Sequence, residues 1–88
     1  MEVIYAREFK MRYAELSVAL QKKAEKQERL FKHNPFHPSL NTEKIEPKGK
    51  EIWTIRIDRK YRIALKLEGD KAIFLTCGPH DWIYRLRF

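Results

Sequence analysis

Residues 52–67 read IWTIRIDRKYRIALKL, and this stretch decides the fold. Apolar and polar side chains alternate on both sides of the central DRK, which is the pattern of two β-strands that each bury one face. The DRK segment is short enough to be the turn of an antiparallel hairpin. If Ile57 pairs with Tyr61 across this turn, Arg56 lies directly opposite Arg62.

The two arginines form an unusual pair. Directly opposed Cβ atoms lie about 4.5–5.5 Å apart, and like charges at that distance destabilise a sheet. Both side chains point to the face that the apolar residues of the hairpin do not occupy. Folding gives no reason to place two guanidinium groups there, whereas a bound phosphate does. The alternative is that each arginine pairs with a local carboxylate, Asp58 or Glu68.

The rest of the chain supplies further strands and two helices. Residues 72–77 follow a second short turn and extend the hairpin into an antiparallel meander. Residues 2–6 alternate as a first strand. From Arg7 onward apolar side chains recur at helical spacing. Ser17 is placed to end one helix and cap a second, which must stop near Asn34-Pro35 because a residue before proline avoids the α region.

These elements predict an α+β fold in the order β-α-α-β-β-β, with one domain at residues 1–88. We expect the two N-terminal helices to pack on one face of an antiparallel sheet, because each layer has one apolar side to bury. The other face would then be free to bind a ligand. The proline-rich connection 34–50 is expected to be mostly irregular, and so long a connection is often functional.

The composition limits the possible partners and locations. A formal net charge of +7 and a pI near 9.7 favour a polyanionic partner, although a small protein can be basic for solubility alone. No apolar run approaches the ~20 residues that span a bilayer. The first ten residues lack the apolar core of a signal peptide, so we expect a cytoplasmic protein without a membrane partner. Cys77 is the single cysteine and no histidine pair has metal-ligand spacing, so neither a metal nor a cofactor is expected.

Two of the histidines are candidates for proton transfer. His80 follows Gly78-Pro79 at the end of the last strand, and an imidazole can accept or donate a proton at neutral pH. Tyr84 lies four residues later, on the same side of a helical turn. Asp81 could orient His80, but we favour a capping role for it. His37 lies in an irregular segment that could aim it at a site, or it is a plain surface residue.

Four segments carry a family likeness: NPFHPSL (34–40), IWTIR (52–56), YRI (61–63) and GPHDWIY (78–84). Together with the element order, they make the chain resemble the RelE/ParE superfamily of toxins from prokaryotic type II toxin–antitoxin modules, in particular its RelE-like branch. The resemblance covers nearly the whole chain. It implies an mRNA interferase, a ribosome-dependent and metal-independent endoribonuclease that cleaves mRNA, inhibits translation and is held inactive by a cognate antitoxin.

The resemblance also implies roles for single residues. Arg62 matches a basic side chain on the scissile phosphate, and Arg56 matches a second basic position. His80 falls where the family has a histidine or arginine, and Tyr84 where it has an aromatic residue. Thr54 stands where some members carry a catalytic lysine. For contact with the RNA we expect four more residues, namely Lys44, Lys48, Lys50 and His37.

The expected reaction is transphosphorylation, in which the RNA 2′-hydroxyl attacks the adjacent phosphate and leaves a 2′,3′-cyclic end. It requires a base, an acid and positive charge at phosphorus. Arg62 and Arg56 would supply the charge and His80 the leading acid or base, with Tyr84 or His37 completing the pair or stacking a base. Two alternatives stay open: a ParE-like inhibitor of DNA gyrase, and a silent member of the fold that binds RNA or antitoxin without cleavage. The oligomeric state also stays open.

Overall fold

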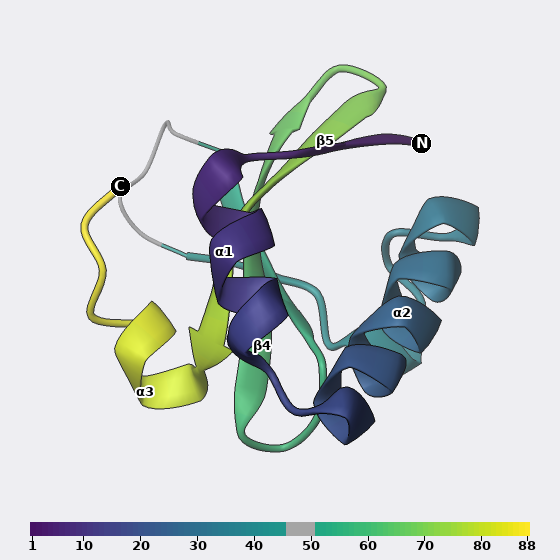
Figure 1. Cartoon of the computed structure of the whole chain (residues 1–88). Helices are drawn as coiled ribbons and strands as arrows, with labels where there is room; N and C mark the ends of the chain where they lie inside the picture. The colour runs from purple at the N-terminus through teal and green to yellow at the C-terminus, as the bar shows by residue number, and fades with distance from the viewer. Residues whose placement is uncertain (46–50) are drawn as a thin grey trace.

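A five-stranded sheet in the spatial order β1-β5-β4-β3-β2 forms the centre of the computed structural model, which describes residues 1–45 and 51–88 (Figure 1). Its strands are β1 (Glu2–Tyr5), β2 (Glu43–Lys44), β3 (Ile52–Arg56), β4 (Tyr61–Glu68) and β5 (Lys71–Pro79). The helices are α1 (Arg7–Glu15), α2 (Val18–His33) and α3 (His80–Ile83), with a 3-10 helix η1 at Pro38–Leu40. The predicted α+β class and element order are confirmed. No helix in the described residues is long and apolar enough to cross a membrane.

The hairpin of β3 and β4 has the predicted register. Ile55 pairs with Ile63 and Arg56 pairs with Arg62 in an antiparallel ladder. The backbone N–H of Ile57 donates to the carbonyl of Tyr61 at 2.9 Å and closes the turn. Strand β5 adds to β4 in antiparallel fashion and completes the meander. The alternation of apolar and polar residues was therefore sufficient to place both arginines.

The first strand makes the sheet mixed, so the expectation of a purely antiparallel sheet holds only from β2 to β5. Strand β1 runs parallel to β5, from the pair Glu2 and Lys71 to the pair Tyr5 and Phe74. The N–H of Ala6 still donates to the Phe74 carbonyl at 2.9 Å, after which the chain enters α1. Parallel neighbours need a long crossover, and here the two helices and the intervening strands provide it.

The helix boundaries follow local capping chemistry. The Ser17 side chain accepts a hydrogen bond from the N–H of Leu20 at 3.2 Å, so it caps α2 as predicted. Helix α2 ends at His33, directly before Asn34-Pro35. The expectation of a mostly irregular connection after it was only partly right. The connection contains η1 and also β2, which pairs with Thr54 and Trp53 along the outer edge of β3.

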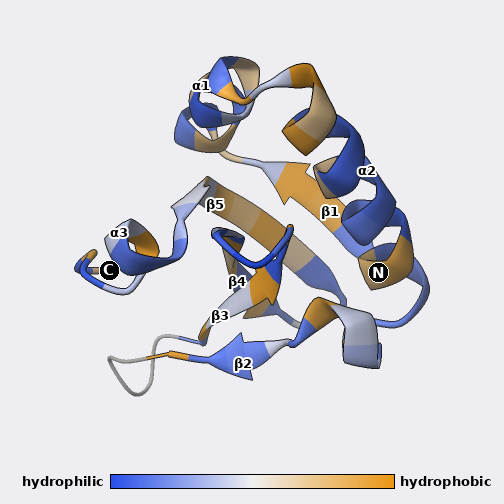
Figure 2. Ribbon diagram, turned by 90° about the horizontal axis from the view of Figure 1, so that it is seen from below, coloured by the Kyte–Doolittle hydropathy of each residue, from blue (hydrophilic) through white to orange (hydrophobic). Residues whose placement is uncertain are grey.

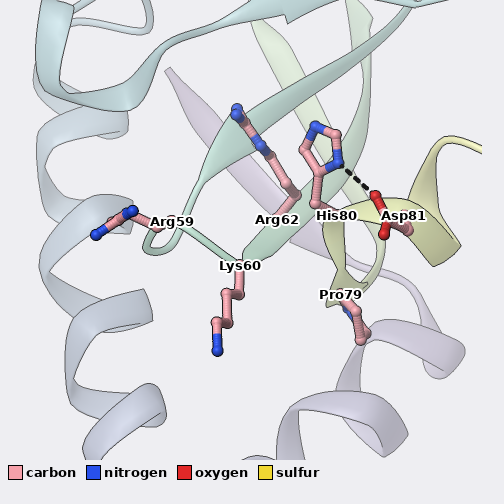
Figure 3. Close-up of a pocket in the computed structure, with 6 residues that line it drawn as sticks. All are labelled: Arg59, Lys60, Arg62, Pro79, His80 and Asp81. Carbon is pink, nitrogen blue, oxygen red and sulfur yellow. Dashed lines mark hydrogen bonds and ion pairs between the residues drawn. The ribbon is translucent and has the colours of Figure 1, made fainter.

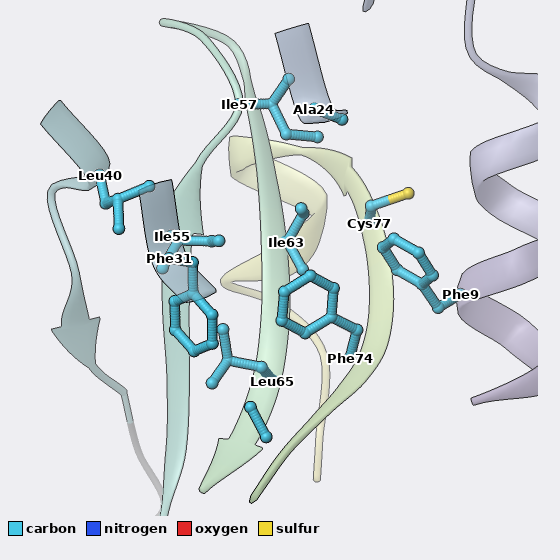
Figure 4. Close-up of a cluster of buried hydrophobic side chains, with 11 residues drawn as sticks. Phe9, Ala24, Phe31, Leu40, Ile55, Ile57, Ile63, Leu65, Phe74 and Cys77 are labelled. Carbon is cyan, nitrogen blue, oxygen red and sulfur yellow. The ribbon is translucent and has the colours of Figure 1, made fainter. Parts of the chain in front are cut away.

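An aromatic core joins the helices to the sheet (Figure 4). Phe74 of β5 meets Phe9 of α1 at a ring-centroid distance of 5.4 Å and Phe31 of α2 at 5.5 Å, both edge to face. Edge-to-face pairs of this kind stabilise a core beyond the burial of their area. Ile55 and Ile63 are fully buried below them. This core holds β3, β4 and β5 rigidly under the two long helices.

The second face of the sheet is not free, which corrects the expectation from the sequence. Helices α2 and α3 lie on opposite sides of the sheet (Figure 2). Thr54, Ala64 and Thr76 are fully buried beneath the C-terminal part of the chain, together with Ile83 of α3. A second small apolar layer exists because α3 folds back and buries Ile83 against the short side chains of this face.

Candidate active site around Arg62 and His80

A basic hollow of about 500 Å³ lies where the β3–β4 turn meets the end of β5 (Figure 3). Arg62 and His80 extend side by side in the same direction, whereas Arg59 and Lys60 point away from them. Both Arg59 and Lys60 are exposed residues of the turn. The residues that line the hollow are Arg59, Lys60, Arg62, Pro79, His80 and Asp81.

Arg62 is the central residue of the hollow. Its side chain is only 7% exposed, and its Nε and Nη1 atoms are buried without a hydrogen-bond partner among the described residues. The remaining guanidinium nitrogen, Nη2, is not enclosed in this way. Each unsatisfied buried donor costs about 1–3 kcal/mol, and arginine is rarely buried unless it is paired. The fold therefore holds a positive charge that internal partners leave unneutralised.

The local acidic residues do not neutralise the arginine pair. Asp58 Oδ1 accepts from the backbone N–H groups of Lys60 at 2.8 Å and Tyr61 at 2.9 Å, so it stabilises the turn. Glu68 pairs with Lys66 at 3.2 Å. The alternative of local carboxylate partners for Arg62 is therefore wrong within the described residues. An external anion is the partner that this geometry favours.

His80 is held at the edge of the hollow by its backbone and its neighbours. Its N–H donates to the Lys60 carbonyl at 2.6 Å, and its Nδ1 lies 3.2 Å from Asp81 Oδ1. The capping role favoured for Asp81 is wrong, because Pro79 is the N-cap of α3 and no side chain bonds there. Asp81 instead contacts the imidazole of His80 through its side-chain carboxylate. The predicted proximity of Tyr84 is confirmed, with ring centroids 4.5 Å apart.

Tyr84 links His80 to a residue that the sequence did not single out. Its hydroxyl donates to Glu43 Oε1 and lies 3.1 Å from Thr54 Oγ1. Burial, followed by the hydrogen bond to Glu43, raises the pKa of Tyr84, while the charge of Arg62 acts in the opposite direction. Tyr84 is therefore a neutral phenol at physiological pH. Glu43 lies on the two-residue strand β2, and only its polar character in the long connection pointed to it.

The remaining predicted residues are not all at the hollow. Arg56 is half-buried beside Arg62 in the ladder but does not line the hollow. Lys44 forms an ion pair with Glu51 at 3.1 Å. The Nδ1 of His37 accepts from the Ser39 N–H at 3.1 Å and caps η1, which is a structural role. Lys48 and Lys50 lie outside the described residues.

The described residues hold no group of three or more histidine, cysteine or acidic side chains arranged to bind a metal. Cys77 is 1% exposed in β5, and burial raises the pKa of its thiol to about 11. The thiol is therefore protonated and enclosed, as expected for a strand cysteine that is not a nucleophile.

Comparison with known proteins places the fold. No family model matches the chain, and no curated protein matches its sequence. Among solved structures, a YoeB/ParE toxin from Agrobacterium tumefaciens superposes with a TM-score of 0.76 at 18% identity, over 91% of this chain and 99% of that chain. YafQ from E. coli gives 0.72 at 14% identity, over 94% and 97%.

A chain of the RelB–RelE antitoxin–toxin complex from Methanococcus jannaschii gives a TM-score of 0.67 at 21% identity, over 92% of this chain and 94% of that chain. At these identities the likeness is one of fold. The predicted resemblance to the RelE/ParE superfamily is confirmed at that level.

Proposed function

We propose that this protein is the toxin of a toxin–antitoxin module and cleaves mRNA on the ribosome by metal-independent transphosphorylation. The observation that carries the proposal is Arg62, a 7% exposed arginine that has no hydrogen-bond partner in residues 1–45 and 51–88 and lies directly beside the imidazole of His80. A phosphodiester is the anion that needs both a fixed positive charge and a proton donor. The fold shared with YoeB, YafQ and RelE toxins supports the same assignment.

The proposed role of Arg62 is to stabilise the charge that develops at phosphorus. The guanidinium is held by the sheet before substrate arrives, so little reorganisation is needed at the moment of reaction. Its low exposure also strengthens the interaction, since water screens it less. Arg56, the cross-strand neighbour, is proposed to contribute a second positive charge from the same face of the hairpin.

Two proton transfers complete the proposed reaction. Glu43 is the proposed base, because its carboxylate can accept the proton of the RNA 2′-hydroxyl while the Tyr84 hydroxyl holds it in place. His80 is the proposed acid, because its imidazole lies beside Arg62 in the hollow and an imidazole can donate a proton near neutral pH. The 2′-oxygen forms a bond to phosphorus, the bond to the 5′-oxygen breaks, and His80 protonates the leaving oxygen. The products are a 2′,3′-cyclic phosphate and a free 5′-hydroxyl.

The proposed partners follow from charge and from the fold. A net charge of +7 suits mRNA, and the proposed contacts to RNA are Lys44, Lys48, Lys50 and His37. Fold neighbours occur in toxin–antitoxin complexes, such as YafQ with DinJ and RelE with RelB. We therefore propose a cognate antitoxin of complementary, acidic charge for this chain, and a cytoplasmic location.

The test is cleavage of a defined mRNA on purified ribosomes. A metal chelator is added at concentrations that leave the ribosomes intact. His80→Ala should lower the cleavage rate about 10²–10⁴-fold, which is the usual contribution of general acid–base catalysis. His33→Ala is the matched control, because His33 is exposed at the end of α2 and outside the hollow. Mapping of 5′ ends should find 5′-hydroxyl termini.

Full cleavage by His80→Ala would refute the proposed chemistry. Absence of cleavage by the unmodified protein, together with inhibition of DNA gyrase supercoiling, would favour the ParE-like alternative instead. Binding of RNA without cleavage and without gyrase inhibition would identify a silent member of the fold.

A further inference from the structure

Helix α3 has only four residues. It begins at His80, and Tyr84 is its C-cap. No side chain caps its N-terminus. Isolated helices shorter than about 12–15 residues are marginal in water, so α3 depends on tertiary contacts for its position. The contacts that hold α3 in place therefore also orient the His80 imidazole relative to Arg62.

One side of α3 faces the candidate site and the other side is packed. Successive helical residues turn by about 100°, so His80 and Tyr84 share a side while Trp82 points in nearly the opposite direction. The rings of His80 and Tyr84 lie 4.5 Å apart on the first side. Trp82 therefore lies on the side of α3 opposite to His80 and Tyr84.

The Trp82 ring contacts both β5 and α1. An added Cβ at Gly78 of β5 would come within 2.6 Å of the ring carbon Cε3. The guanidinium carbon of Arg12 of α1 lies 4.5 Å from the ring centroid. We call Gly78, Trp82 and Arg12 the Trp82 stack. It is a close contact that any residue other than glycine at position 78 would disturb.

Within the part of the chain that the structure describes, Arg12 makes a close side-chain contact with the Trp82 ring. It is exposed on α1 and forms no ion pair among the described residues, although Glu8 and Glu15 occupy the same helix within reach in sequence. Its contact with Trp82 bridges α1, which packs on β5, to the terminal helix. A cation over the face of an indole is the most favourable pairing of this type.

We infer that Arg12 is a positioning residue for the candidate active site. Its contact with the Trp82 ring, together with the close packing of that ring on Gly78, fixes the rotation of α3, which presents His80 to the hollow with Tyr84 beside it. The inference rests on the proposed function, because the site that it serves is the proposed RNA-cleaving one. Arg12 itself touches neither His80 nor Arg62 in the described contacts and takes no part in proton transfer.

The test compares three substitutions at α1 in the full chain. Arg12→Ala should lower the turnover number about tenfold or more with KM for RNA unchanged, since a misplacement of 1 Å can cost about 10²-fold. Arg12→Lys keeps a cation over the ring and should restore part of the rate. Arg7→Ala removes the same charge from an exposed position of the same helix and should retain full turnover.

A structural readout separates this inference from the proposed function. Proton NMR should detect the contact between the His80 and Tyr84 rings in the unmodified protein and in Arg7→Ala, and should lose or weaken it in Arg12→Ala. Gly78→Ala should weaken it as well, because the new methyl group displaces Trp82. This readout stays valid even if the protein cleaves no RNA.

Retention of the full ring contact in Arg12→Ala would overturn the inference, whether or not the protein cleaves RNA. Equal losses in Arg7→Ala and Arg12→Ala would also overturn it, because they would show that charge on α1, and not the Trp82 stack, sets the rate. Far-UV circular dichroism of each variant verifies that the fold is intact.

Discussion

Replacing Arg62 by methionine should make the folded protein more stable while it removes the cleavage activity. Arg62 is 7% exposed, and two of its side-chain nitrogen atoms are buried without a hydrogen-bond partner in the described part of the chain. Each such group costs about 1–3 kcal/mol in the folded state. Methionine has a similar length, fills the same space and has no donor to satisfy. Because Nη2 is not among the fully buried atoms, we expect the free energy of unfolding to rise by only about 1–2 kcal/mol.

Thermal unfolding measures this gain directly. In a domain of this size each kcal/mol shifts Tm by roughly 4–8 °C, so the increase for Arg62→Met should be well resolved. Arg59→Met is the matched control, because Arg59 lines the same hollow but is exposed. Arg59→Met should change the free energy of unfolding by no more than about 0.5 kcal/mol, as most surface substitutions do.

Phosphate provides a second measurement on the same proteins. An anion that binds the folded state raises its stability by mass action, so phosphate should raise the Tm of the unmodified protein more than that of Arg62→Met, which keeps only the general stabilising effect of the salt. A loss of stability of about 1 kcal/mol or more in Arg62→Met would refute the reasoning. It would mean that the guanidinium is satisfied inside the fold and that the hollow is not built around an unpaired charge.

Two further predictions concern groups with raised pKa values. Burial, aided by a hydrogen bond to Glu25, raises the pKa of Tyr13 from 10.0 to about 12, so its contribution to stability is complete below pH 10 and is lost as the pH rises through about 12. Tyr13→Phe should flatten the fall of Tm across this range, and an unchanged slope would contradict the assignment. Cys77, with a buried thiol of pKa about 11, should react with a disulfide reagent at neutral pH only at the rate of unfolding; fast labelling of the folded protein would contradict its burial.

Local patterns in the sequence predicted the elements and one decisive pairing. Alternation in residues 52–67 was enough to place Arg56 opposite Arg62, because a one-residue slip would expose the apolar set. The i to i+4 spacing likewise brought Tyr84 next to His80. The same reasoning did not find β2, since two residues carry no periodicity, and Glu43 was missed with it.

The sequence also did not predict that the second face of the sheet is covered. The apolar residues of the tail, Trp82 and Ile83 among them, show no periodicity that would predict its folding back over Thr54 and Thr76. Nor did the sequence predict that Lys60 rather than Arg56 would line the hollow. These outcomes depend on which distant segments of the chain pack together, and hydrophobic periodicity contains no such information.

The amino-acid sequence by itself determined the α+β class, the faces of β3 and β4 and the placement of two arginines on one of them. These features depend on the two-residue repeat of a strand and the 3.6-residue repeat of a helix, which are local properties of the backbone. Only the tertiary structure decided that Arg62 is buried without a hydrogen-bond partner among the described residues, that His80 lies beside it, and that Tyr84 contacts both His80 and Glu43. Burial and electrostatic environment depend on contacts between segments that lie far apart in the chain.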